Sequence, residues 1–151
     1  MMADYTQSGI GPHKAPVNSA IEIHDSSLTS IAKRSDLLEL RFHAYIHTSL
    51  GTPGVDAGTG WTQDVMLVFD GGTLEGSITE WPAVLYDGTL EIDGEASKNI
   101  IPIPLDRKGN IQLTLKPSFM DDPIVVRGNH VHLELQGAPI YVEKFSGSTM
   151  D

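Results

Sequence analysis

The chain has 151 residues, no cysteine, and a formal net charge of −10 from ten Lys and Arg against twenty Asp and Glu. The length corresponds to one ordinary domain, and the lack of cysteine excludes disulfides, thiolate nucleophiles and zinc sites built on cysteine. The negative charge repels nucleic-acid backbones and anionic lipids, so we expect neither nucleic acid nor membrane as a partner. The chain has no signal-peptide pattern and no apolar run near the roughly 20 residues of a membrane helix, so we expect a cytoplasmic protein of bacterial type.

The first half of the chain predicts an arm, a strand, a short turn and a long strand. Residues 1–18 contain Gly and Pro without periodicity, which predicts an extended or disordered arm before a single domain at 19–147 and a tail at 148–151. Ile21 and Ile23 indicate the first strand, and "SSLTSIAKRSD" predicts a short helix or turn. The segment "LLELRFHAYIHTS", residues 37–49, alternates strictly and predicts a long strand with its apolar side buried.

The second half predicts a loop followed by short strands. Residues 49–61, "SLGTPGVDAGTGW", contain five Gly or Pro residues and predict a long loop. Glycine-containing stretches such as "FDGGT", "RKGN", "RGN" and "QGAP" predict turns, and "VLYDGTLEI" predicts a hairpin. Period-two alternation recurs in four further segments, at Val65, Leu67 and Phe69; at Leu90 and Ile92; at Ile111, Leu113 and Leu115; and at Val131, Leu133 and Leu135.

These elements define the fold class. Six segments alternate with a period of two, and no segment beyond residue 35 sustains a helical stripe. We therefore predict an all-β, antiparallel, two-sheet β-sandwich of the jelly-roll type, with a small β-barrel as the runner-up.

Histidines and polar residues on the outer sides of the strands are the first candidates for a site. The alternation places Arg41, His43, Tyr45 and His47 on one side of the long strand, and His24 follows Ile23 out of phase. Together with Trp61 at the end of the predicted loop, these residues are a candidate face for a ligand or a protein partner. The competing interpretation is an ordinary solvated sheet face.

The stretch "HVHLE" is a candidate metal site. Side chains at i and i+2 of a strand start roughly 7 Å apart on one face, so His130 and His132 could bind one metal ion with Glu134. The pattern resembles the His-x-His pair of cupins, but the spacing of the Glu differs. In addition, the alternating apolar residues Val131 and Leu133 are expected to point into a barrel, which places the histidines outside it. We expect no cofactor, and the alternative is a divalent transition metal held by these three residues.

Other site chemistries have weaker support. No G-x-S-x-G elbow is present, and the short glycine motifs precede no strand-to-helix unit that could cradle a phosphate. Trp61 and Trp81 would suit a sugar-stacking platform if they were exposed, although tryptophan is buried in most proteins.

The segments "IEIHDSSL", "GTGWTQDVMLVF" and "GAPIYVEKF" together resemble a group of small uncharacterised bacterial β-sandwich proteins. In that group an H-D-S-x-L turn opens the fold and a Y-V-E-x-F strand closes it. The resemblance spans residues 19–146 loosely. It implies an all-β fold and no assigned activity, and it draws attention to His24 and Asp25, of which Asp25 with Ser26 is expected to cap a turn.

From these observations we expect a non-enzymatic binding or protein-interaction module that uses the histidine-rich face or the 49–61 loop. Its partner would be another protein, which includes a second copy of this chain, or a small ligand. The alternatives are a cupin-like metal enzyme and a carbohydrate-binding module.

Overall fold

A computed structural model describes residues 18–147, so the predicted arm, apart from Asn18, and the predicted tail lie outside the described residues. These residues form ten strands and no helix, and hence contain no helix long and apolar enough to cross a membrane. All strand pairings are antiparallel, which confirms the predicted class. The strands are β1 (Asn18–Arg34), β2 (Leu37–Ser49), β3 (Asp56–Asp70), β4 (Thr73–Glu75), β5 (Ala83–Ile92), β6 (Glu95–Lys98), β7 (Ile100–Ile103), β8 (Asp106–Pro117), β9 (Ile124–Leu135) and β10 (Ile140–Gly147).

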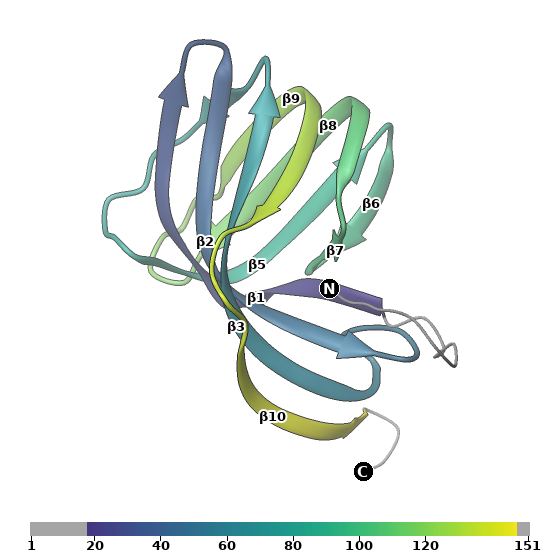
Figure 1. Ribbon diagram of the computed structural model, residues 1–151. Helices are drawn as coiled ribbons and strands as arrows, with labels where there is room; N and C mark the ends of the chain where they lie inside the picture. The colour runs from purple at the N-terminus through teal and green to yellow at the C-terminus, as the bar shows by residue number, and fades with distance from the viewer. Residues whose placement is uncertain (1–17, 148–151) are drawn as a thin grey trace.

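Six of the strands close into a barrel in the order β1-β2-β3-β9-β8-β5 (Figure 1). The ring closes because β3 pairs with both β2 and β9, and because β5 meets β1 at Ser27 and Leu28. The remaining four strands, β4, β6, β7 and β10, are attached to this ring. The structure therefore fits the barrel that was the runner-up, and it does not clearly divide into the two sheets of a sandwich.

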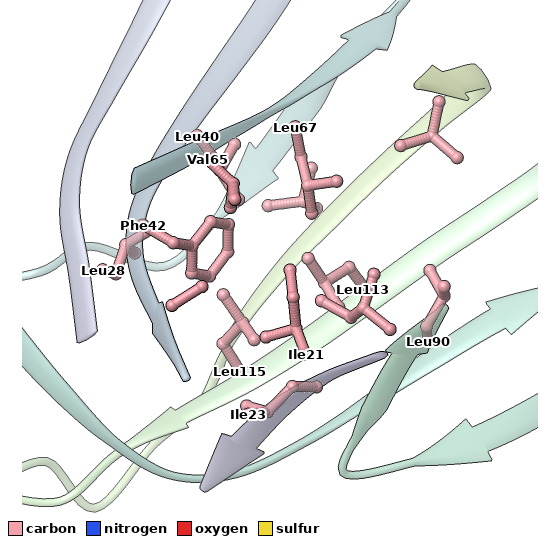
Figure 2. Close-up of a cluster of buried hydrophobic side chains, with 14 of the residues drawn as sticks. Ile21, Ile23, Leu28, Leu40, Phe42, Val65, Leu67, Leu90, Leu113 and Leu115 are labelled. Atoms are coloured by element: carbon pink, nitrogen blue, oxygen red, sulfur yellow. The ribbon is translucent and has the colours of Figure 1, made fainter. Parts of the chain in front are cut away.

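The barrel is filled by the apolar side chains that the alternation assigns to the inside. Figure 2 shows Leu40 and Phe42 of β2 packed with Val65 and Leu67 of β3, opposite Leu113 of β8. Each of these side chains is at most 1% exposed. The predicted orientation of the long strand is thus confirmed, because a slip by one residue would expose side chains whose burial contributes roughly 1.5 to 3 kcal/mol each.

The three longest strands continue beyond the barrel. β3 pairs with β9 only from Val65 to Asp70, whereas its first half, from Asp56 to Thr62, pairs with β10. The start of β1 pairs with β7 instead of β5. The result is a five-stranded region in the order β10-β3-β2-β1-β7, which runs downward from the barrel in Figure 1 and which we call the sheet extension.

Two sequence predictions of irregular structure are correct only in part. In the segment "SSLTSIAKRSD" residues 26–34 belong to β1 and pair with β2 almost throughout, and only Ser35 and Asp36 form a turn. The predicted loop 49–61 is a loop only at residues 50–55, and residues 56–61 open β3. The glycines there do not break the strand, because they pair with β2 in an unbroken register and with β10 on the other side.

Several predicted turns also lie inside strands. Asp87 and Gly88 of the expected hairpin are within β5, next to a shift in its register with β8. The two-residue hairpin turn falls instead at Asp93 and Gly94, whose φ angles of 52° and 87° suit a turn with two left-handed residues. The "RKGN" and "RGN" stretches lie within β8 and β9. The "FDGGT" and "QGAP" turns lie where the sequence predicts them.

Candidate functional site

The predicted face on β2 is on the outer side of the sheet, but its residues do not form one cluster. Arg41 donates a hydrogen bond to Gln136, which follows β9. His43 Nδ1 lies 3.0 Å from Asp64 Oδ1 of β3, and both side chains are more than half exposed. An exposed pair of this kind contributes little to stability or specificity. This half of the face is an ordinary solvated sheet surface.

His47 corrects the prediction of a uniformly solvated face, since it is only 2% exposed. The loop 50–55 folds over it, and the backbone N–H of Gly54 donates to its Nδ1. Burial lowers the pKa of His47 and favours the neutral imidazole. The strand period correctly places His47 opposite the core, but the loop covers it in a way that alternation does not reveal.

Tyr45 crosses β3 to reach β10. Its hydroxyl donates a 2.5 Å hydrogen bond to Glu143 Oε2. Burial and this hydrogen bond raise the pKa of Tyr45. The crossing requires Gly60, because a Cβ at that position would lie within 2.6 Å of Tyr45 Cζ. Gly58 similarly leaves room for His47, whose Nε2 would lie 2.8 Å from an added Cβ.

His24 lies in an irregular part of β1, where it forms hydrogen bonds with Asn99 and Tyr86. Between Glu22 and Ser27 the register of β1 with β2 shifts, and His24 lies in the resulting bulge. The hydroxyl of Ser26 holds the bulge by donating to Glu22 O and accepting from Tyr45 N–H. The "HDS" motif thus forms a bulge within a strand, and Ser26 supplies the local hydrogen bonds that a cap was expected to supply.

The three predicted metal ligands lie on the outside of β9. The rings of His130 and His132 are 5.9 Å apart, and His132 Nε2 is 2.8 Å from Glu134 Oε2. His130 Nε2 is instead bonded to Asp106 Oδ1 at 2.6 Å, which raises the pKa of His130. In the described part of the chain no three His, Asp or Glu side chains are grouped as metal ligands. The metal site stays a prediction from the sequence.

Trp61 lies on the other face of the sheet extension, where it lines a cavity of about 280 Å³ at the mouth of the barrel. Its ring contacts Tyr141 of β10 edge to face, at 5.3 Å between centroids, and its Nε1 donates to Thr59 Oγ1. Ile46, Ile103 and Leu135 complete an apolar wall around it. Trp61 stays a candidate site residue, and it does not share a face with His43 or Tyr45.

The cavity continues into a shallower depression along the same face, since Thr48 and Thr59 line both. The strand register explains the order of the side chains along this path. Lys144, Thr59, Thr48 and Ser19 are consecutive partners across β10, β3, β2 and β1, and so point to one side. We call the combined path the mouth groove: it has an apolar end at Trp61, hydroxyl groups in the middle, and Lys144 together with Asp56 at the far end.

Sequence reasoning selected Trp61 and the 49–61 segment, which contains Thr59, but it missed the other walls of the mouth groove. Leu135 and Ile103 come from strands that join β3 and β1 only in the folded chain. Lys144 was not selected because β10 was expected only from the family resemblance. One signal was available: in "GTGW" the larger residues Thr59 and Trp61 alternate with glycines, as in a strand with one crowded face.

Comparisons of the chain with models of known protein families, with curated proteins and with solved structures found no significant match. The function must therefore be argued from the geometry of the molecule.

Proposed function

We propose that this protein is a non-enzymatic binding module whose mouth groove holds a small amphipathic anion. The apolar part of the ligand packs against Trp61, Ile103 and Leu135, and its anionic group lies toward Lys144. The single observation that carries the proposal is the continuity of an apolar cavity with a row of hydroxyls that ends in a cation.

The groove has the chemistry that ligand sites share. Such sites are concave and mostly apolar, with a few polar groups that fix the orientation of the ligand. The hydroxyl oxygens of Ser19 and Thr48 are 3.0 Å apart and share one hydrogen bond. The rest of their hydrogen-bonding capacity faces the groove. Among the described residues Lys144 has no ion pair, which leaves its ammonium group for a ligand.

Tryptophan fluorescence tests the proposal directly, because the chain contains only two tryptophans. In a Trp81→Phe background the emission reports on Trp61 alone. We expect decanoate, added below its micellar concentration, to change this emission with saturation. Leu135→Asp places a carboxylate in the apolar wall. This change should weaken the binding of decanoate by at least about 10-fold. The matched control is Val84→Asp, at a similarly exposed position on another surface, which should bind as the parent does.

A second comparison isolates the role of Lys144. Lys144→Gln keeps a polar side chain and removes its charge, so it should weaken the binding of decanoate about 3- to 5-fold and leave the binding of decan-1-ol unchanged. An emission that does not respond to decanoate, or that responds equally in Leu135→Asp, would overturn the proposed site. Unchanged binding of decanoate in Lys144→Gln, or an equal loss for both probes, would show that the charge of Lys144 does not hold the anionic group.

A further inference from the structure

The bulge of β1 creates a second hollow, which is separate from the mouth groove. Here β1 changes its neighbour from β7 to β5, and four residues line an open depression of about 300 Å³: His24, Tyr86, Asp87 and Asn99. They come from β1, from β5 and from the single residue between β6 and β7. None of them belongs to the mouth groove.

Asn99 is held rigidly in this hollow. Its backbone has a φ of 63°, in the left-handed region that Asn tolerates better than most residues. Its N–H donates to Gly88 O at 2.8 Å, and its carbonyl accepts from Ile23 N–H at 2.9 Å. Its side-chain Oδ1 accepts from His24 N–H at 2.6 Å. Because Oδ1 faces the backbone of β1, the side-chain NH₂ group is the part available to a ligand.

His24 and Asp87 supply the complementary acceptors. His24 Nδ1 lies 2.7 Å from Tyr86 O, and since a carbonyl can only accept, Nδ1 carries the proton. In the neutral ring Nε2 is then an acceptor. Asp87 uses Oδ1 to accept from Gly88 N–H at 2.8 Å. Among the described residues no hydrogen bond uses Asp87 Oδ2 or His24 Nε2.

Tyr86 adds an exposed aromatic surface. Tyr86 is 61% exposed, and its ring and that of His24 meet edge to face, with 5.9 Å between centroids and 76° between planes. The hollow thus combines one aromatic ring, one fixed amide donor and two acceptors. A sugar ring matches this set, because its C–H face packs on an aromatic ring and its neighbouring hydroxyls both donate and accept. An anionic ligand is disfavoured here by the carboxylate of Asp87, which lines the hollow.

We propose that this hollow is a binding site for a neutral sugar ring. The sugar lies against Tyr86, accepts a hydrogen bond from Asn99 Nδ2 and donates to Asp87 Oδ2 and His24 Nε2. This site differs from the mouth groove in position and in ligand class, so either proposal can fail without the other.

The test is a titration of the full chain followed by amide NMR spectra. The probes are glucose, galactose, mannose, xylose and N-acetylglucosamine, each with its β-linked disaccharide. At least one should shift the signals of Tyr86, Asp87 and the Asn99 side chain with saturation by about 10 mM, which is above a millimolar Kd. Signals of Trp61 and Lys144 should stay in place.

Three variants separate the sugar site from a purely structural role of the same residues. Asn99→Asp keeps the oxygen that accepts from His24 N–H but removes the donor, so binding should weaken about 10-fold with no change in the unfolding midpoint. Tyr86→Ala should weaken binding about 10-fold, and Tyr86→Phe should retain it within about 3-fold. Leu74→Ala, at an exposed apolar position of β4 outside both the hollow and the mouth groove, is the control and should leave binding unchanged.

Two results would overturn the proposal. The first is the absence of saturable shifts at these residues for every sugar in the panel. The second is a sugar whose affinity is unchanged in both Asn99→Asp and Tyr86→Ala, because that sugar would bind elsewhere.

Discussion

The barrel and the sheet extension use the same three strands in different ways. Within the barrel, the inner face of β2 and β3 carries Phe42 and Val65, which are closed in by β8 and β9. A few residues further along the same face, Thr48 and Thr59 line an open groove. β2 and β3 stay in one unbroken register through both regions. The difference lies in whether other strands cover the face, and this separates the structural part of the molecule from the part available to ligands.

The largest expected effect is therefore at the covered end of this face. Phe42 is 1% exposed, so Phe42→Ala should lower the free energy of unfolding by about 3 to 5 kcal/mol through lost burial and an unfilled cavity. Thr48→Ala, on the same face of the same strand, removes a hydroxyl bonded to Ser19 and should cost about 1 kcal/mol or less. Chemical denaturation measures both. Similar losses would mean that the groove is as tightly covered as the barrel interior.

The second prediction concerns the outer face of the sheet extension. Gly60→Ala places a methyl group against Tyr45 and displaces it from Glu143, which should cost about 1 to 3 kcal/mol. The loss should shrink in a Tyr45→Ala background, since the clash is then absent, and a double-mutant cycle measures this coupling. Gly137→Ala is the control: its added Cβ would have no neighbour closer than 3.8 Å, so it should stay within about 0.5 kcal/mol. Additive effects of Gly60→Ala and Tyr45→Ala would contradict this account of the glycine.

The third prediction is a pH dependence on the outer face of the barrel. The hydrogen bond to Asp106 raises the pKa of His130 above its ordinary value of 6.5. The folded state then binds the proton more tightly than the unfolded state, so this stabilisation is fully present below pH 6.5 and is lost as the pH rises through the folded pKa. The imidazole NMR signals of His130 report the pKa. Asp106→Asn should lower it, whereas Glu134→Gln, which contacts His132, should not. No change in Asp106→Asn would refute the assignment.

The sequence predicts the covered part of the molecule better than the open part. Alternation identified the inward side of β2 correctly because Leu40 and Phe42 gain free energy only when buried. It could not distinguish a barrel from a sandwich, since closure depends on the pairing of β3 with β9 and of β5 with β1, which are distant in sequence. The same limit applies to the sites: His24 meets Asn99, and Trp61 meets Leu135, only through strand pairing.

Local signals were also misread where tertiary pairing prevailed. Asp87 and Gly88 have the composition of a hairpin turn, but β8 pairs across them and the chain continues as a strand. His47 has the position of a solvated residue, but the loop at 50–55 covers it. In both cases the missing information was which segment lies against the residue, which a single strand pattern does not contain.

The smallest expected effect is at His43, which shares β2 with Phe42 and points the opposite way. Its side chain and that of Asp64 are 54% and 68% exposed, so solvent screens the pair that joins them at 3.0 Å. His43→Ala should therefore change the free energy of unfolding by no more than about 0.5 kcal/mol, against the several kcal/mol expected for its neighbour. Denaturation of the two variants under one condition makes the comparison, and Asp64→Ala should match His43→Ala if the pair acts alone. A loss of stability in His43→Ala comparable to that in Phe42→Ala would contradict this contrast between the two sides of the strand. It would mean that the outer face is covered in solution by a second copy of the chain or by another protein.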